Sequence, residues 1–204
     1  VVSSLEKEME RRSESQSQFT YMFLGNALYV FTLLLLFTIY LALFRRDYFT
    51  KPRSIAMLYS LITIFPVLVS LMMQHTYFGF SVYVLPFAFV PIFIRVFMDS
   101  RTAFISHIVM VLLCAYVVRY QFEFIFIQIV AGLVAIYSLR EMSSRAQVFK
   151  TAVMVCLAMC VSYFTLRLMQ SGDEFKLDSN MYYHFFICGV LLLLAYPLMY
   201  LVEK

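Results

Sequence analysis

The chain has 204 residues, of which 63% are hydrophobic and 14% are charged, and its formal net charge is +4. A soluble domain of this length could not bury so much apolar surface, so the composition excludes an ordinary soluble globular protein. Lipid suits such a chain as a solvent, because an α-helix satisfies its own backbone hydrogen bonds there. We therefore expect an all-α, polytopic membrane protein.

Seven apolar runs follow one another along the chain. Each is close to the ~20 residues that a helix needs to cross ~30 Å of hydrocarbon. They cover residues 21–44, 54–73, 79–98, 104–120, 122–139, 148–169 and 181–202. The sequence thus predicts a seven-transmembrane helix bundle over residues 19–204. Because seven is odd, we expect the two chain ends on opposite sides of the membrane.

The segment before the first run, residues 1–18, is polar and charged. Glu8 and Arg12 are spaced for an i,i+4 ion pair on a helix. Two interpretations remain open for this segment: a juxtamembrane helix or linker from an extracytoplasmic domain, and a frayed tail. No cleavable signal sequence is visible in it. We expect an upstream segment to carry this end of the chain across the membrane.

Positive charge sorts the loops between the runs into two alternating sets. The first set has nine basic residues, which are Arg45, Arg46, Lys51, Arg53, Arg101, Arg140, Arg145, Lys150 and Lys204. The second has Arg119 and Lys176, and three more in the N-terminal arm. Basic residues are retained in the cytoplasm. We therefore expect the N-terminus outside and the C-terminus in the cytoplasm.

Prolines and one glycine mark special positions in the predicted helices. The candidate bends are Pro66 in the second run, Pro86 and Pro91 in the third, and Pro197 in the seventh. Each proline should free a backbone carbonyl and bend its helix. Pro86 and Pro91 would form either a hinge or fixed bends, and we favour fixed bends. Gly132 is a candidate for close helix packing, and the fourth and fifth runs should be antiparallel neighbours because only residues 119–121 join them.

Ionisable residues in or beside the runs are candidate functional residues, because a charge in lipid costs ~2.5–3.5 kcal/mol or more. We single out a cytoplasmic cluster that would couple the bundle to an intracellular module. Its members are Arg95, Asp99, Arg101, His107, Arg140 and Arg145. Interface anchoring by snorkelling is the alternative. Glu123, Arg167 and His184 are expected near the outer interface, where the same alternative applies.

Motifs for catalysis and metal binding are missing from the sequence. It has no Gly-x-Ser-x-Gly elbow, no His-Glu-x-x-His pair and no phosphate-binding glycine loop. The four cysteines fall inside the runs without a disulfide framework or zinc spacing. We expect no catalytic residue, metal ligand or cofactor in this chain. Membrane lipids are its expected partners, and nucleic acid is not.

Five stretches carry a resemblance to a known family. They are 84–95 (VLPFAFVPIFIR), 99–104 (DSRTAF), 122–139 (FEFIFIQIVAGLVAIYSL), 144–149 (SRAQVF) and 195–204 (AYPLMYLVEK). Together they resemble the membrane domain of the bacterial seven-transmembrane HD-hydrolase receptors, the PgpH-type cyclic-di-AMP phosphodiesterases. The resemblance covers most of residues 20–204.

This resemblance implies an extracytoplasmic domain before the bundle, a cytoplasmic HD domain just past Lys204, and a place in the bacterial inner membrane. The divalent metal of such enzymes, Mn or Fe, would be bound by the HD domain. This chain has no His-Asp dipeptide, so the resemblance assigns no catalytic residue to it. We expect a sensor and signal-transmission domain whose partners are its own outer and HD domains and a second copy in a homodimer. A small transporter or channel, and a passive membrane anchor, are the alternatives.

Overall fold

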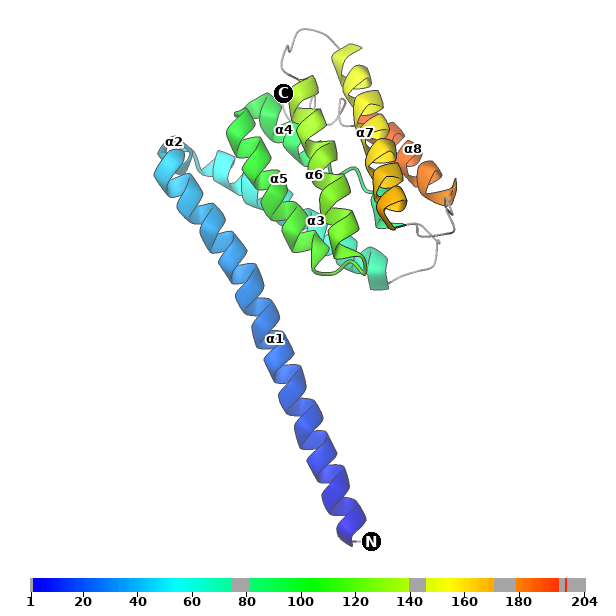
Figure 1. Cartoon of the computed structure of the whole chain (residues 1–204). Coiled ribbons are helices and arrows are strands. Elements are labelled where there is room, and N and C mark those ends of the chain that lie inside the picture. Colours follow the sequence, from blue (N-terminus) through cyan, green and yellow to red (C-terminus); the bar gives the residue numbers. More distant parts are fainter. Residues whose placement is uncertain (1, 75–80, 140–145, 171–178, 195–196, 198–204) are drawn as a thin grey trace. The chain divides into compact units, whose positions relative to one another are not determined.

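The computed structural model describes residues 2–74, 81–139, 146–170, 179–194 and 197. All regular structure in this part of the chain is helical, and it contains no strand. The expected all-α class is thereby confirmed. The helices are α1 (Val2–Phe44), α2 (Arg46–Phe49), α3 (Pro52–Gln74), η2 (Val82–Val84, a 3₁₀-helix), α4 (Phe89–Phe97), α5 (Ser100–Ala115), α6 (Gln121–Ser138), α7 (Ala146–Gln170) and α8 (Ser179–Leu193), as labelled in Figure 1.

The chain divides into two compact units, residues 1–46 and 47–204. The first unit is α1, a single helix of 43 residues. The polar segment that precedes the first apolar run is the start of this helix. From Gln18 to Phe44 the helix is apolar, with a mean hydropathy of 2.4. Inside this part the hydroxyls of Thr32 and Thr38 donate to backbone carbonyls four residues earlier, at 2.8 Å and 2.7 Å, so neither hydroxyl is left unsatisfied in an apolar setting.

Four of the described helices are long and apolar enough to cross a membrane. They are Gln18–Phe44, Pro52–Gln74, Gln121–Ser138 and Phe149–Gln170. Three shorter apolar segments, Val82–Phe97, Ser100–Ala115 and Ser179–Leu193, alternate with them or follow them. Every one of the seven predicted runs therefore has an apolar helical counterpart. The counterpart of the fourth run ends at Ala115, earlier than the predicted residue 120, because the chain turns over residues 116–120.

The third run differs from the continuous helix expected over residues 79–98. It consists of η2, a non-helical stretch around Pro86, and α4. Proline has no N–H to donate and cannot continue the 3₁₀ turn into an α-helix. Pro91 is the third residue of α4, where the N–H would have no partner inside the helix anyway. Pro86 therefore separates two helices, and Pro91 lies in the first turn of the second one, where it removes no hydrogen bond within the helix.

The other two candidate bends lie in different settings. Pro66 is inside α3, which continues beyond it to Gln74. The chain there tolerates one missing backbone hydrogen bond without ending the helix. Pro197 is exposed and lies among residues 195–204, most of which fall outside the described residues. The structure therefore describes no bend at this last proline.

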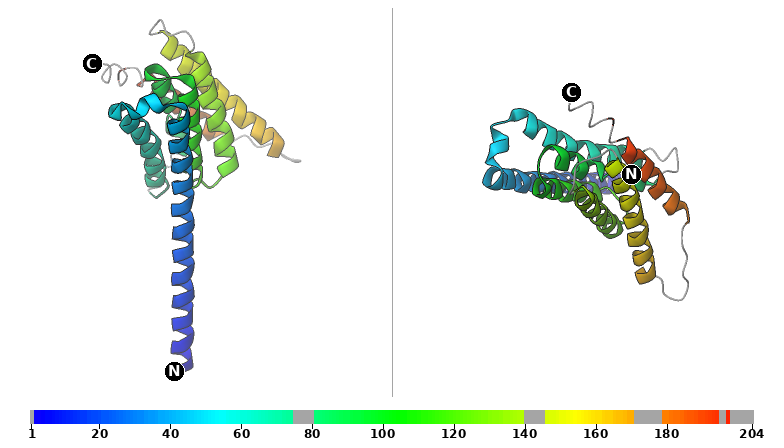
Figure 2. Two further views of the ribbon diagram at one scale, coloured as in Figure 1. Left: turned by 90° about the vertical axis from the view of Figure 1, so that its left-hand side faces the viewer. Right: turned by 90° about the horizontal axis from the view of Figure 1, so that it is seen from above.

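In the second unit, α6 lies between α5 and α7, and the views in Figures 1 and 2 agree on this order. The helix pairs α7 and α8, α4 and α5, and α3 and α5 also pack together, and η2 packs on α8. As expected from their short connection, the neighbours α5 and α6 are antiparallel. Their position brings the middle of α5 against the middle of α6, where Ser106, His107 and Gln128 are buried.

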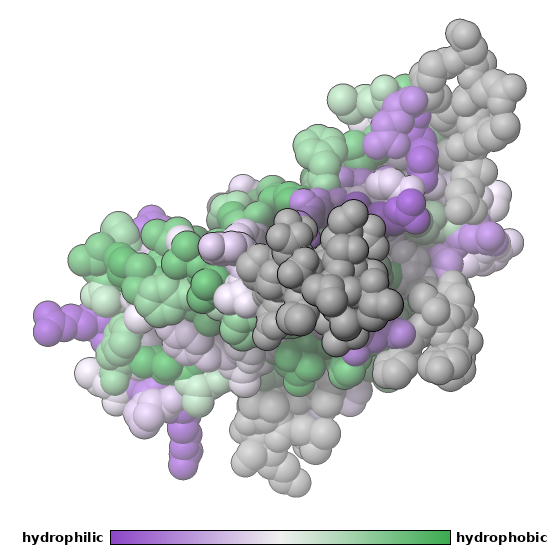
Figure 3. All heavy atoms as spheres, turned by 90° about the horizontal axis from the view of Figure 1, so that it is seen from below, coloured by the Kyte–Doolittle hydropathy of each residue, from purple (hydrophilic) through white to green (hydrophobic). Residues whose placement is uncertain are grey.

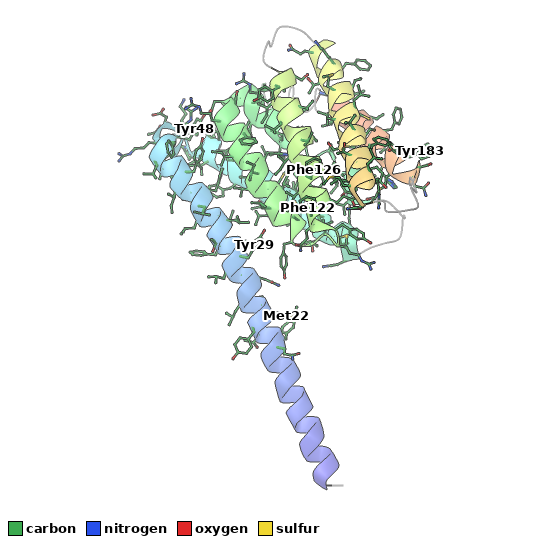
Figure 4. The ribbon with its side chains drawn as sticks, viewed as in Figure 1. Met22, Tyr29, Tyr48, Phe122, Phe126 and Tyr183 are labelled. Carbon is green, nitrogen blue, oxygen red and sulfur yellow. The ribbon has the colours of Figure 1, made fainter. Side chains whose placement is uncertain are left out.

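The outward-facing surface of the helices is apolar. Large hydrophobic residues on α7 and α8 are exposed, among them Leu157, Val161, Phe186 and Val190. Figure 3 shows one face of the molecule, on which hydrophobic residues cover much of the surface that is not grey. Phe122 and Phe126 on α6 and Tyr183 on α8, labelled in Figure 4, are also exposed. Such a surface suits contact with lipid.

Candidate functional site

The first functional feature is the start of α5, where Asp99 is the N-cap. Its backbone is extended, and its carboxylate accepts hydrogen bonds from the backbone N–H groups of Arg101 (3.1 Å) and Thr102 (3.3 Å). An acidic N-cap satisfies donors that the helix cannot use. The other carboxylate oxygen accepts a hydrogen bond of 2.9 Å from the hydroxyl of Tyr48 on α2. Asp99 therefore both begins α5 and ties α2 to it.

A groove opens beside this helix start, between α4, α5 and α6. Its volume is about 550 Å³. The residues that line it are Arg95 from α4, Ser100, Arg101 and Phe104 from α5, and Leu133, Ile136 and Tyr137 from α6. We call it the basic groove, after its two arginines.

The basic groove brings together only two members of the predicted cytoplasmic cluster, Arg95 and Arg101. Asp99 is adjacent in sequence but is held by Tyr48 and the backbone of α5. His107 is not in the groove: it is completely buried in the middle of α5. The structure therefore does not group His107 with Arg95 and Arg101. Residues 140 and 145, the last two members (Arg140 and Arg145), lie outside the described residues.

His107 makes a hydrogen bond from α5 to the backbone of α6. The Nε2 atom of its ring lies 2.8 Å from the backbone carbonyl oxygen of Gln128. Since a carbonyl only accepts, Nε2 must carry the proton and donate it. The other ring nitrogen, Nδ1, is buried and has no hydrogen-bond partner among the described residues. The imidazole thus connects two helices through one nitrogen and leaves the second one unused.

Gly132 makes this approach possible. It lies one helical turn after Gln128, and a Cβ atom added to it would clash with Cδ2 and Nε2 of the His107 ring. Any side chain at this position would occupy the space through which the imidazole reaches the carbonyl. The close packing expected of Gly132 is therefore between the α6 backbone and a histidine ring, rather than between two helix backbones.

Three more polar side chains are buried on the same two helices. Thr102 and Ser106 are one turn apart on α5, and Gln128 contributes its side chain from α6. Among the described residues, Oγ1 of Thr102, Oγ of Ser106 and Nε2 of Gln128 have no hydrogen-bond partner. We call Thr102, Ser106, His107 and Gln128 the polar column. Unpaired polar groups are costly inside a membrane bundle, which makes the column a candidate for function.

Sequence reasoning selected only one member of the polar column, His107. His107 stands out as an ionisable residue in an apolar run, but the uncharged Gln128 does not, and hydroxyl residues are common in helices. The signal that would have identified them is their spacing, since Thr102 and Ser106 repeat at the helical i,i+4 interval on one face.

At the opposite end of α6, the side chain of Glu123, which the sequence predicts near the outer interface, is buried within the protein. Its side chain is only 5% exposed. The hydroxyl of Tyr83 in η2 lies 3.4 Å from its Oε1 atom, at donating distance. The non-helical stretch at Pro86 is what allows η2 to present Tyr83 to α6.

An aromatic cluster surrounds Tyr83 and joins three helices. Its rings are those of Tyr83, Phe87, Phe124, Tyr163, Tyr182 and Phe185, in successive contacts of 5.1–6.2 Å between ring centroids. Arg167 binds the cluster from α7: its Nε donates to the Tyr163 hydroxyl at 2.9 Å, and its Cζ lies 5.0 Å from the centroid of that ring. The guanidinium is thus stabilised by a hydrogen bond and by the π-face of the ring.

The break near Pro86 is also in direct contact with α8. Cys188 on α8 donates from its Sγ to the backbone carbonyl of Leu85, at 3.6 Å. Phe185, one turn earlier on α8, packs edge-on against Tyr83 at 5.6 Å. Among the described residues, no group of three or more His, Cys, Asp or Glu side chains could hold a metal ion.

A comparison with known proteins identifies the family of the chain. The family model described as a 7TM receptor with an intracellular HD hydrolase matches residues 20–204. The chain belongs to this family. No curated protein and no solved structure matches the chain.

All the features described above lie inside the matched part of this 7TM receptor domain. The basic groove and the aromatic cluster lie toward opposite ends of α6, and the polar column lies between them. The receptor domain therefore has polar or charged groups at both ends and in the middle of the packed helices α5 and α6. Such an arrangement suits a membrane receptor, in which events at one membrane face must affect the other.

Proposed function

We propose that this chain is the sensor and signal-transmission domain of a receptor that couples an extracytoplasmic domain to a cytoplasmic HD-type cyclic-di-AMP phosphodiesterase. The family match supports this reading, since its description joins a 7TM receptor to an intracellular HD hydrolase. The chain itself carries out no catalysis in this proposal. The divalent metal, Mn or Fe, belongs to the HD domain that follows.

The topology that goes with this proposal has seven crossing segments in a bacterial inner membrane. They are the apolar part of α1, then α3, η2 with α4, α5, α6, α7 and α8. The charge distribution of the loops supports an outer N-terminus and a cytoplasmic C-terminus. In this orientation the basic groove faces the cytoplasm, and Glu123 with the aromatic cluster lies at the outer side. A second copy of the chain is the proposed partner in a homodimer.

The observation that carries the proposal is the contact between η2 and α8. Cys188 hydrogen-bonds the Leu85 carbonyl at the break, and Phe185 packs on Tyr83. A rearrangement at the break must therefore move α8, which is the last described helix before the chain continues toward the hydrolase. Transmission requires that a ligand or partner bind two arrangements of this contact with different affinity.

The baseline test is cyclic-di-AMP hydrolysis with added Mn²⁺, by this chain and by the same chain extended with its native C-terminal continuation. We expect hydrolysis only by the extended form, because the HD metal ligands would lie in the continuation. Absence of hydrolysis in both forms would refute the coupling to a cyclic-di-AMP phosphodiesterase and favour a transporter.

A crosslink between η2 and α8 tests the transmission step in the extended protein. Leu85→Cys is introduced beside the native Cys188, with Cys114, Cys156 and Cys160 replaced by alanine, and a short bifunctional thiol reagent joins the two thiols. We expect the crosslink to change the hydrolysis rate by about fivefold or more, since coupling free energies of ~1–3 kcal/mol are typical. The matched control is the same background with Leu85 intact. Equal rates with and without the crosslink would instead favour a passive anchor.

A further inference from the structure

The basic groove has features of a binding site that the receptor role does not assign. Its walls come from three helices, and it lies at the end of the bundle where α4 ends, α5 begins and α6 ends. Its volume of about 550 Å³ is within the range of small-molecule sites. The residues at its rim and those on its walls differ in chemistry, and this difference indicates the class of ligand.

Two guanidinium groups give the groove its positive charge. Arg95 and Arg101 line it from α4 and α5, and none of the described residues that line it is acidic. Asp99 is the nearest carboxylate in sequence, but the backbone of α5 and the Tyr48 hydroxyl already occupy its oxygens. The Nε atom of Arg95 is buried and has no hydrogen-bond partner among the described residues. A buried charged donor without an acceptor is unfavourable, and an anionic oxygen would relieve it.

Apart from Ser100, the remaining walls of the groove are apolar. Phe104 from α5, and Leu133 and Ile136 from α6, form them together with Tyr137. Tyr137 is 73% exposed although it lies on an apolar helix. A tyrosine with an apolar ring and a polar hydroxyl is typical of the boundary between hydrocarbon and headgroups. A ligand that fits this lining has a phosphate at one end and hydrocarbon at the other.

We infer that the basic groove binds an anionic glycerophospholipid, with its phosphate on Arg95 and Arg101 and its acyl chains along Phe104, Leu133 and Tyr137. Basic pockets between membrane helices are known to recognise anionic headgroups. Arginine is well suited to this task, since its planar donors pair with two phosphate oxygens at once. The inference does not depend on the hydrolase, because lipid binding is a property of this chain alone.

The test measures dissociation constants for the purified chain in neutral detergent by native mass spectrometry. The probes are dioleoylphosphatidylglycerol, dioleoylphosphatidylcholine with the same acyl chains, glycerophosphoglycerol without acyl chains, and inorganic phosphate. We expect the anionic lipid to bind about tenfold or more tightly than the zwitterionic one, and the two soluble phosphates not to displace it. Equal affinity for both lipids overturns the inference. Displacement by inorganic phosphate or glycerophosphoglycerol overturns the assignment to a lipid.

Variants show whether the preference arises in the groove. Each of Arg95→Gln and Arg101→Gln should lower the affinity for phosphatidylglycerol about fivefold, and together they should abolish the preference over phosphatidylcholine. Arg53→Gln is the matched control, because Arg53 is an exposed arginine that does not line the groove. A preference that survives in the double variant, or that falls equally in the control, overturns the inference.

Two further variants apply if the double glutamine variant does not fold. Tyr137→Ala changes an exposed residue and should weaken phosphatidylglycerol binding by removing part of the apolar wall. Arg95→Lys keeps the positive charge but loses the planar guanidinium group and its paired donors. It should therefore weaken phosphatidylglycerol binding less than Arg95→Gln does. Unchanged affinity in both Tyr137→Ala and Arg95→Gln would place the lipid elsewhere and overturn the inference. Circular dichroism and gel filtration confirm the fold of every variant.

Discussion

Gly132→Ala is expected to lower the free energy of unfolding of the receptor domain by about 2–4 kcal/mol. The added methyl group would clash with the ring of His107, and overpacking a tight site typically costs ~1–3 kcal/mol. Moving the ring away also breaks its hydrogen bond to the Gln128 carbonyl, which adds the cost of an unpaired buried group. The measurement is unfolding by SDS in mixed micelles, followed by circular dichroism.

Gly189→Ala is the matched control for this change. A Cβ atom at Gly189 would lie 3.4 Å from Cβ of Cys156 and 3.8 Å from its Sγ, which is ordinary van der Waals contact. We expect a change below about 1 kcal/mol there. The double variant His107→Ala with Gly132→Ala should recover part of the loss, because the two substitutions share one contact. Equal losses at the two glycines, or strictly additive effects of the double variant, would contradict the proposed role of Gly132.

Phe185→Ala is expected to lower the free energy of unfolding by about 3–5 kcal/mol, the usual cost of removing a buried phenyl ring. Phe185 is 0% exposed. Its ring contacts Tyr83 and Tyr163 at 5.6 Å and Tyr182 at 6.2 Å between centroids. Its removal would therefore leave a cavity where η2, α7 and α8 meet. The same unfolding experiment measures the loss.

The neighbouring phenylalanine provides the control. Phe186 is 66% exposed, so Phe186→Ala should change the unfolding free energy by less than about 0.5 kcal/mol. In the extended protein, a conservative Phe185→Leu variant should also weaken the effect of the η2–α8 crosslink on hydrolysis, since it loosens the same junction. Similar stability losses from Phe185→Ala and Phe186→Ala would show that the aromatic cluster is not a packed core.

Much of the fold followed from local sequence properties. The all-α class and the order of the apolar helices follow from composition and run length, because each helix satisfies its own backbone and needs only enough apolar residues. The turn between α5 and α6 and their antiparallel arrangement follow from a short connection. Gly132 could be selected in advance as well, since only a missing side chain lets another group approach a helix backbone.

The prolines show which features of the fold could not be predicted from local sequence properties. Sequence alone indicated that Pro86 and Pro91 would disturb the third run, since proline lacks an N–H. It could not indicate that the helix stops at Pro86 and begins again just before Pro91. That outcome depends on which backbone carbonyls accept hydrogen bonds from donors elsewhere in the fold. The carbonyl of Leu85 accepts one from the thiol of Cys188 on α8, a residue 103 positions away in the sequence.

The tertiary structure decided which partners the polar and charged side chains of the bundle have. His107 and Glu123 were both expected near a membrane interface, because depth along a helix was the only information available. Helix packing buries both side chains inside the protein, with partners from α6 and η2 respectively. Hydropathy and charge determined that this chain is a helical membrane domain, since these are properties of each segment by itself. Which polar side chains meet depends on the rotation and pairing of helices, and these are set by contacts between residues far apart in the sequence.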